Sequence, residues 1–253
     1  VVPVELWVIV GLLCARVNSA FSQLACRCGS TASAAVHGAP IEIHAMTPVR
    51  FPQRGLYAIT DGPRPDLMAV VAQALAGGAR VVQYRDKTDD STRRHAEAAA
   101  LKQLCDAHAV PLIVNDDVAL ALAVGAAGVH LGRDDDAVAA ARAVLGAGAI
   151  VGVSCYGSLE RARAAAADGA DYVAFGAFHA SPTKPHAVRA SIDVLRHSAT
   201  LGVPRVAIGG ITADNAPGLV EAGADVLAVI SAVFGAADVR AAAQRFARLY
   251  SPD

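Results

Sequence analysis

Short runs of apolar residues alternate with longer amphipathic or alanine-rich segments from residue 55 to the end of the chain. Each apolar run has the length of a strand and is continuous, which is typical of parallel strands that are buried on both faces. The predicted strands cover residues 56–60, 81–84, 111–114, 128–131, 150–153, 172–175, 205–208 and 226–230. The predicted helices cover residues 64–77, 91–108, 118–124, 136–145, 159–168, 190–199, 214–222 and 238–250.

Eight strand–helix units in about 200 residues predict an α/β fold, a (β/α)₈ TIM barrel. A doubly wound open sheet is the alternative. No Gly-x-Gly-x-x-Gly follows the first predicted strand, which disfavours the dinucleotide-binding form of that sheet. Segments 168–171 and 222–225 place a glycine at the end of a helix, just before a strand. We interpret them as structural turns at the bottom of the barrel.

Residues 1–50 lack the alternation of strands and helices. They contain an apolar segment at 6–14 and a small, polar segment at 19–33. We interpret 1–50 as an N-terminal extension that is disordered or dispensable, and 51–253 as a TIM-barrel catalytic domain. Met46 lies just before the regular pattern, so an over-long start assignment would explain the extension. A secretory signal is less favoured because no basic residue precedes the apolar segment.

The composition narrows the class of protein. Hydrophobic residues make up 54% of the chain, which is ample for a core, and the net charge is −1. This balance disfavours nucleic acid as a partner. No apolar run approaches the roughly 20 residues of a membrane helix, so no membrane partner is expected. The five cysteines form no even framework, and reduced thiols in a cytoplasmic protein are the default expectation.

Two acidic residues follow consecutive predicted strands. Active sites of TIM barrels lie at the C-terminal ends of the strands, where Asp116 and Asp135 are expected on the same edge of the sheet. Neighbouring carboxylates repel unless a cation lies between them, and hard oxygen ligands suit Mg²⁺. The pair therefore predicts a magnesium site. The alternative is two surface aspartates that cap helices.

Cationic and glycine-rich segments at other strand ends predict two anion sites. Arg85 and Lys87 project to the same side of an extended segment and, with Lys184, suit a diphosphate. The loops that begin with Gly209-Gly210 and Ser231 suit a monophosphate, because many barrels bind phosphate at their last two loops. The alternatives are a solvated charge run at 85–87 and a tight structural turn at 209–210.

Other polar residues are expected to be structural. His130 lies inside an apolar strand, so a hydrogen-bonded core histidine is favoured over a ligand. Cys105 lies in a predicted helix and is assigned to the core. Cys155 follows Ser154 at the rim of the barrel and is a candidate reactive thiol, although no neighbouring residue would lower its pKa.

Several motifs occur together, in order, between residues 55 and 250. They are Gln83-Tyr-Arg-Asp-Lys87, Asn115-Asp116, Gly128-Val-His-Leu-Gly132 with Asp135, Gly152-Val-Ser154, Ser181-Pro-Thr-Lys184, Ala207-Ile-Gly-Gly-Ile211 and Val229-Ile-Ser231. At these residues the chain resembles the thiamine-phosphate synthase family. That family joins 4-amino-2-methyl-5-hydroxymethylpyrimidine diphosphate to a thiazole phosphate carboxylate. The products are thiamine monophosphate, pyrophosphate and carbon dioxide, so the resemblance implies a transferase with small-molecule substrates.

The resemblance also implies roles for individual residues. Residues expected to hold the pyrimidine diphosphate are Gln83, Arg85, Lys87, Asn115, Ser154 and Lys184, with Tyr84 and Asp86 in the same motif. Residues expected to hold the thiazole phosphate are Ser181, Thr183, Gly209, Gly210, Ile230 and Ser231. Asp116 and Asp135 would bind Mg²⁺, the one expected cofactor. Arg85, Lys87, Ser154 and Lys184 are the expected catalytic group, and a homo-oligomer is left open.

The sequence departs from the family pattern at a few positions. The family usually has Leu at Tyr84, Glu at Asp86, Gln-Glu at residues 133–134, Thr-His-Thr at 155–157 and Thr at Ser181. One alternative is a relative that acts as a thiazole tautomerase and uses a histidine as acid or base. Another is a non-catalytic barrel that binds a phosphorylated ligand. Both are disfavoured because every metal carboxylate and cation of the pattern is present.

Overall fold

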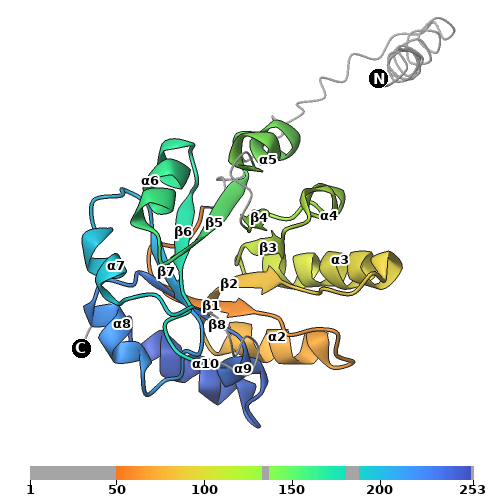
Figure 1. Cartoon of the computed structure of the whole chain (residues 1–253). Coiled ribbons are helices and arrows are strands. Elements are labelled where there is room, and N and C mark those ends of the chain that lie inside the picture. Colours follow the sequence, from red (N-terminus) through yellow and green to blue (C-terminus); the bar gives the residue numbers. More distant parts are fainter. Residues whose placement is uncertain (1–49, 133–136, 181–187, 252–253) are drawn as a thin grey trace, which may run out of the picture. The chain divides into compact units, whose positions relative to one another are not determined.

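The computed structural model describes residues 50–132, 137–180 and 188–251. Its strands are β1 (Gly55–Ile59), β2 (Ala79–Tyr84), β3 (Leu112–Asn115), β4 (Gly128–Leu131), β5 (Ile150–Tyr156), β6 (Tyr172–Phe175), β7 (Arg205–Ile208) and β8 (Val226–Val229). All neighbours pair in parallel, and β8 pairs with β1, so the sheet closes (Figure 1). The closed sheet confirms the predicted TIM barrel and excludes the open-sheet alternative. The N-terminal extension predicted at 1–50 lies almost wholly outside the described residues.

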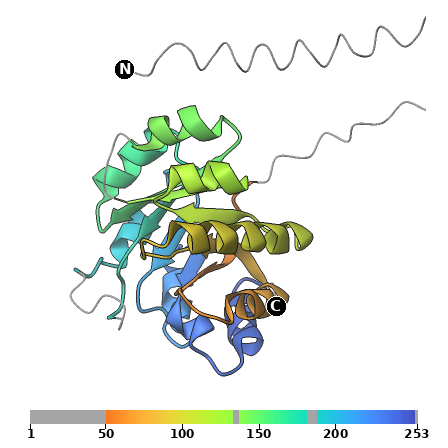
Figure 2. The same ribbon diagram turned by 90° about the vertical axis from the view of Figure 1, so that its right-hand side faces the viewer.

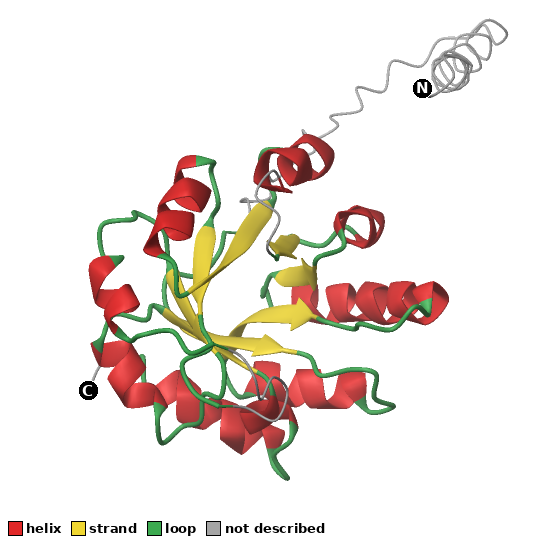
Figure 3. Ribbon diagram, in the orientation of Figure 1, coloured by secondary structure: helices red, strands yellow, loops and turns green. Residues whose placement is uncertain are grey.

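Helices surround the strands (Figure 3). They are α2 (Leu67–Ala76), α3 (Ser91–Ala107), α4 (Val118–Val124), α5 (Ala137–Leu145), α6 (Leu159–Ala167), α7 (Asp193–His197), α8 (Ala216–Glu221), α9 (Ser231–Phe234) and α10 (Val239–Arg248). Figure 2 shows the long α3, in yellow, at the front. The helix predicted at 190–199 is shorter than expected, as α7 has only five residues. In the described ranges, no helix is both long and apolar enough to span a bilayer.

Alternation along each strand divides the core into two layers. One set of side chains, such as Leu56 and Val82, points outward and packs against the helices. The other set fills the barrel and includes Tyr57, Val81 and Ile113. Successive side chains of a strand point to opposite faces, so both sets are apolar and each strand is a continuous apolar run. The bulk of the barrel is therefore a packed core, and polar chemistry is restricted to the strand ends.

An aromatic residue from outside the strands joins the interior layer. Phe51 lies four positions before β1 and stacks on Tyr172, with ring centroids 3.9 Å apart and an interplanar angle of 14°. Gly152, on the neighbouring strand, makes room for the same ring, because an added Cβ would lie 1.9 Å from a Tyr172 ring carbon. The glycine of the Gly152-Val-Ser154 motif is thus explained by packing inside the barrel.

The glycine turns before strands are structural, as predicted. Gly169 and Gly223 have φ angles of 89° and 103°, which a residue with a Cβ rarely adopts. The aspartate two positions later accepts a backbone hydrogen bond from the preceding strand, from Val151 to Asp171 and from Arg205 to Asp225. Each of these aspartates also accepts hydrogen bonds from an arginine. These turns fix the N-terminal end of the barrel, away from the predicted site.

Candidate active site

The described members of the predicted site lie at the C-terminal ends of the strands. Gln83 is the next-to-last residue of β2, Asn115 is the last residue of β3, and Ser154 is near the end of β5. Gly209 and Ile230 directly follow β7 and β8. Because the strands are parallel and the sheet is closed, one rim of the barrel carries all of them. Asp135, Ser181, Thr183 and Lys184 lie outside the described residues.

A continuous hydrogen-bonded chain crosses the interior of the barrel below this rim. Gln83 Nε2 donates to the hydroxyl of Tyr57 over 2.7 Å, and the hydroxyls of Tyr57 and Tyr172 are 2.9 Å apart. The Tyr172 hydroxyl lies 2.9 Å from His130 Nδ1. His130 Nε2 lies 2.9 Å from Ser154 Oγ. Two residues of the predicted site are therefore joined through three buried side chains from other strands.

Two donor–acceptor orders satisfy the members of this chain beyond Gln83. In one, Tyr57 donates to Tyr172 and Tyr172 donates to His130 Nδ1; in the other, His130 Nδ1 donates to Tyr172 and Tyr172 donates to Tyr57. A neutral imidazole that accepts at Nδ1 donates from Nε2, here to Ser154 Oγ. In the first order the Ser154 hydroxyl keeps its own hydrogen for an acceptor at the barrel rim, and in the second it donates that hydrogen to His130 Nε2.

The ionisation states agree with both orders. Burial lowers the pKa of His130 to about 4, against a weaker opposing effect of Asp116, so the imidazole is neutral. Burial raises the pKa of the Tyr57 and Tyr172 hydroxyls, so both stay protonated. The prediction that His130 is a hydrogen-bonded core residue is confirmed. The two tyrosines were not identified from the sequence, because each lies in an apolar run that reads as ordinary core.

Asp116 and Asp117 are adjacent in the sequence but have different structural roles. Asp117 caps α4 by accepting from Leu120 N over 2.8 Å, and it forms an ion pair with Arg94 over 2.8 Å. Asp116 has the left-handed φ of 60° and an exposed carboxylate. Asn115 Nδ2 donates to one of its oxygens over 2.7 Å. Asp116 therefore leaves carboxylate oxygen free at the rim, whereas Asp117 is a structural cap.

The carboxylate of Asp116 lies beside the end of β4. A Cβ added at Gly132, just after β4, would lie 3.5 Å from Asp116 Oδ1. Asp116 N also donates to the carbonyl of His130 on β4 over 2.8 Å. Within the residues that the structure describes, no group of three acidic, histidine or cysteine side chains forms a metal cluster. One exposed carboxylate here fits Mg²⁺, which commonly uses one or two carboxylates together with substrate phosphates.

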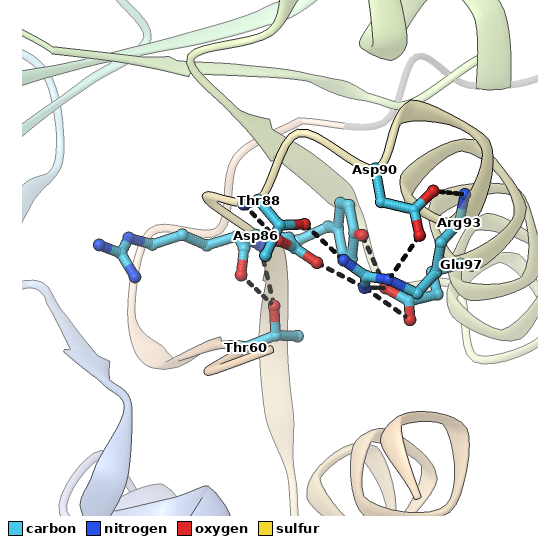
Figure 4. Close-up of polar contacts among 8 residues, drawn as sticks. Thr60, Asp86, Thr88, Asp90, Arg93 and Glu97 are labelled. Carbon is cyan, nitrogen blue, oxygen red and sulfur yellow. Dashed lines mark hydrogen bonds and ion pairs between the residues drawn. The ribbon is translucent and has the colours of Figure 1, made fainter. Parts of the chain in front are cut away.

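The side chains at the end of β2 and in the segment after it do not all point toward the rim. The Asp86 side chain is fully buried and accepts from Arg93 Nη1 of α3 over 2.6 Å, as Figure 4 shows. The Tyr84 hydroxyl donates to Glu97 on the same helix over 2.7 Å. Tyr84 and Asp86 thus face α3 rather than the rim, which argues against the direct substrate contact expected of them.

The two glycines after β7 are required by packing. Gly209 and Gly210 have φ angles of 103° and 62°. A Cβ on Gly210 would lie 2.3 Å from the carbonyl oxygen of Ala180, and one on Gly209 would lie 2.4 Å from the Ala177 Cβ. His179 N also donates to the carbonyl of Gly209 over 2.9 Å. The structural alternative considered for this turn is supported, and the turn seats the segment that follows β6.

The short helix α9 directly follows Ile230, the residue after the end of β8. Its first residue, Ser231, is exposed, and Arg64 Nη1 donates to the carbonyl of Phe234 at its other end over 2.9 Å. The two cysteines of the barrel are core residues. Burial raises the pKa of Cys105 to about 12, as expected for a core thiol. Cys155 is fully buried in the core layer between strands and helices, so the idea of a reactive thiol at the rim is wrong.

Comparisons with known proteins identify the family of this chain. The model of the family described as thiamine monophosphate synthase matches residues 56–233. The thiamine-phosphate synthase of Thiobacillus denitrificans is 56% identical over 203 residues, covering 79% of this chain and 96% of that protein. That of Chromobacterium violaceum is 56% identical over 195 residues, covering 76% and 94%.

Solved structures give the same result. A thiamine phosphate pyrophosphorylase from Pyrococcus furiosus superimposes with a TM-score of 0.70 and 36% identity, covering 78% of this chain and 95% of that chain. The 3-hexulose-6-phosphate synthase of Salmonella typhimurium, at 22% identity and a TM-score of 0.61, covers 78% and 97% and shares the fold alone. The profile match and the high identity over nearly the whole length of the relatives decide the assignment. The chain belongs to the thiamine monophosphate synthase family.

Proposed function

We propose that this protein is a thiamine-phosphate synthase, a transferase that joins the pyrimidine diphosphate to the thiazole phosphate. The observation that carries the proposal is 56% identity to thiamine-phosphate synthases over 96% of a relative's length. In the reaction, the bond between the pyrimidine methylene carbon and the diphosphate oxygen breaks, and its electrons leave with pyrophosphate. The lone pair of the thiazole nitrogen then forms the new carbon–nitrogen bond. The thiazole carboxylate is lost as carbon dioxide, its bonding electron pair stays on the thiazole, and the thiazole takes up a proton from water.

In this proposal the cations at the rim stabilise the leaving diphosphate. Arg85 offers a planar fork for two phosphate oxygens, and Lys87 and Lys184 act as point charges. Preorganised positive charge that meets negative charge developing in the transition state is an effective form of catalysis. Gln83 and Asn115 would orient the pyrimidine, and the contact of 2.9 Å between His130 Nε2 and Ser154 Oγ supports Ser154 as a fixed polar contact for the substrate.

Asp116 and Asp135 are the residues proposed to hold Mg²⁺. A bound Mg²⁺ would neutralise charge on the diphosphate and make pyrophosphate a better leaving group. The support from the described residues is the exposed carboxylate of Asp116, directed toward the end of β4. Its neighbour Asp117 is engaged in capping α4 and cannot substitute for it without giving up that role.

The chemistry does not require a strong general base. An electron-rich aminopyrimidine can support a methylene cation, so departure of pyrophosphate can precede attack by the thiazole nitrogen. His130 is neutral and has both ring nitrogens engaged, which supports a positioning role rather than acid–base catalysis. The contribution of the protein is then orientation and electrostatics.

The thiazole phosphate is proposed to bind at the loops after β6, β7 and β8. The residues concerned are Ser181, Thr183, Gly209, Gly210, Ile230 and Ser231. Backbone N–H groups at such loops are suited to phosphate in many TIM barrels. Ser231 is exposed at the start of α9, which supports its inclusion. The substrates are small molecules, and a cytoplasmic location and a homo-oligomer remain predictions.

The alternatives have less support. A tautomerase-like relative would need a histidine as acid or base, but residue 156 is tyrosine and His130 is committed to the buried chain. A non-catalytic binder would not need both the metal carboxylates and the cations, and the sequence retains all of them.

The deciding experiment is an assay with both substrates and Mg²⁺ that scores thiamine monophosphate and pyrophosphate together. We expect the two products to appear in equal amounts and only when both substrates are present. Omission of either substrate is the control. Release of pyrophosphate without thiamine monophosphate, or isomerisation of the thiazole alone, would contradict the proposal.

A further inference from the structure

We propose that Arg93 of α3 is a positioning residue for the two rim cations Arg85 and Lys87, and that it acts through Asp86. The inference rests on the proposed function, since it assigns Arg85 and Lys87 to the pyrimidine diphosphate. It also gives Asp86 and Tyr84 a role other than direct substrate contact. The argument comes from the contacts on both sides of the segment between β2 and α3.

On the helix side, Asp86 is held by a set of contacts that Figure 4 draws. Its side chain has 0% exposure, and one carboxylate oxygen lies 2.6 Å from Arg93 Nη1. Its other oxygen accepts from Thr88 N over 2.8 Å. Arg93 Nη2 donates to the Thr88 hydroxyl as well. Residues 86 and 88 of the segment are therefore both tied to one guanidinium.

Arg93 is itself fixed by further carboxylates. Its Nη1 lies 3.0 Å from both oxygens of Glu97, one turn along the helix, and its Nε lies 3.5 Å from Asp90. The hydrogen bonds that Arg93 donates to Asp86 and Glu97 raise its pKa, so the charge is permanent. Burial raises the pKa of Asp86, but bonds from Arg93 and Thr88 outweigh it and hold the pKa below its usual value. The pair is therefore ionised and rigid.

On the opposite side, the backbone of Arg85 is anchored to the end of β1. The Thr60 hydroxyl accepts from Arg85 N over 2.8 Å and donates to the Arg85 carbonyl over 3.2 Å. Figure 4 shows Thr60 below the segment and Arg93 to its right. The segment is thus clamped between two elements at consecutive residues.

The clamp leaves the cations available. Among the residues that the structure describes, neither Arg85 nor Lys87 forms an ion pair, although Asp86 between them is buried in one. Side chains of an extended segment alternate in direction, so fixing Asp86 toward α3 directs its two neighbours toward the rim. A fixed cation stabilises a leaving diphosphate better than one that must be ordered during the reaction.

The test compares Arg93→Gln with Arg142→Gln. Arg142 forms an ion pair with Asp171 over 2.7 Å at the other end of the barrel, with 25% of its side chain exposed against 28% for Arg93. We expect Arg93→Gln to raise the KM for the pyrimidine diphosphate by about tenfold. The KM for the thiazole phosphate should change by less than about twofold, and Arg142→Gln should change neither KM.

Two further measurements keep the test decisive. The inhibition constant of inorganic pyrophosphate reports the diphosphate site alone and should rise in parallel with the KM. Arg93→Lys keeps the positive charge but loses the planar guanidinium that bonds Asp86 and Thr88 together. It should therefore restore only part of the affinity for the pyrimidine diphosphate. If Arg93→Gln does not fold, Glu97→Gln loosens the same guanidinium and should raise the same KM by a smaller factor.

The outcomes separate this inference from the proposed function. Equal changes in both KM values, or a lower Tm with unchanged KM values, would overturn the positioning role while leaving the synthase assignment intact. A wild-type protein that forms no thiamine monophosphate would overturn the proposed function itself. A parallel rise in the pyrimidine KM and the pyrophosphate inhibition constant supports both.

Discussion

The hydroxyl groups of Tyr57 and Tyr172 meet at 2.9 Å inside the barrel, although the residues are 115 positions apart in the chain. Their contact connects Gln83 on one side with His130 on the other. A polar chain inside an apolar barrel is stable only if every member is satisfied, and here each group has a partner. This series of buried hydrogen bonds therefore sets the orientation of the Ser154 side chain at the rim.

Removing one hydroxyl should break this chain. Tyr172→Phe keeps the ring that stacks on Phe51 but leaves Tyr57 and His130 Nδ1 without their partner. We expect the free energy of unfolding in urea to fall by about 1–3 kcal/mol. Tyr250→Phe is the control, because that hydroxyl makes a single longer hydrogen bond of 3.3 Å to Ala224. Similar losses in the two variants would contradict a special role for the chain.

The buried imidazole predicts how stability depends on pH. The pKa of His130 is about 4 in the folded protein, lowered by burial from 6.5. Below pH 6.5 the unfolded chain binds a proton at this residue that the folded protein does not. Stability from this group is therefore complete above pH 6.5 and is lost as the pH falls towards 4, by up to about 3 kcal/mol.

The comparison that isolates this effect is wild type against His130→Asn, measured in EDTA. Carboxylates elsewhere titrate in both proteins, so their contribution cancels in the difference. The wild-type protein should lose more unfolding free energy between pH 7 and pH 4.5 than the variant does. An identical loss in both proteins would show that His130 is not the group responsible.

Asp116 and Asp117 should give opposite phenotypes. Asp116→Asn keeps a residue that tolerates the left-handed φ of 60°, so folding should be unchanged within about 0.5 kcal/mol. Turnover should fall by about 100-fold or more, since a proposed metal ligand is lost. Asp117→Ala removes the cap of α4 and the ion pair with Arg94. It should lose about 1 kcal/mol of stability and keep most of the activity. Full activity in Asp116→Asn would contradict the metal role.

Gly210 and Gly125 form a matched pair for testing the turn after β7. Their φ angles are 62° and 64°, so alanine at either position costs about 1–2 kcal/mol in backbone strain. An added Cβ meets nothing within 4 Å at Gly125, but at Gly210 it lies 2.3 Å from the carbonyl oxygen of Ala180. Gly210→Ala should therefore lower Tm further than Gly125→Ala and should alone raise the KM for the thiazole phosphate. Equal Tm values would show that the clash relaxes without cost.

The barrel could be predicted because its strands are buried on both faces and therefore stand out as short apolar runs. The carboxylate Asp116 and the cation Arg85 could be placed at the rim, because each directly follows a strand. The site residues also form an ordered series of motifs, and the family follows from these. Local sequence was sufficient wherever a residue's role depends on its position along one strand.

The remaining features depend on partners that are distant in the sequence. Tyr57 and Tyr172 could not be identified, because a tyrosine in an apolar run gives no sign of the group its hydroxyl meets across the barrel. The sequence motif groups Asp86 with Arg85 and Lys87 as a substrate-binding residue. Side chains alternate in direction along an extended segment, so the Asp86 side chain is expected to point away from those of its two neighbours. Only the position of Arg93 on α3 shows what Asp86 contacts.

The stacking of Phe51 on Tyr172 has a consequence for where the folding unit begins. This ring supplies part of the barrel floor, although it precedes the first strand. A shortened version that starts at residue 50 keeps the floor closed, whereas one that starts at Gly55 opens the interior beneath Tyr172 to water. A shortened version of the chain should therefore begin upstream of Phe51, so that this ring is kept.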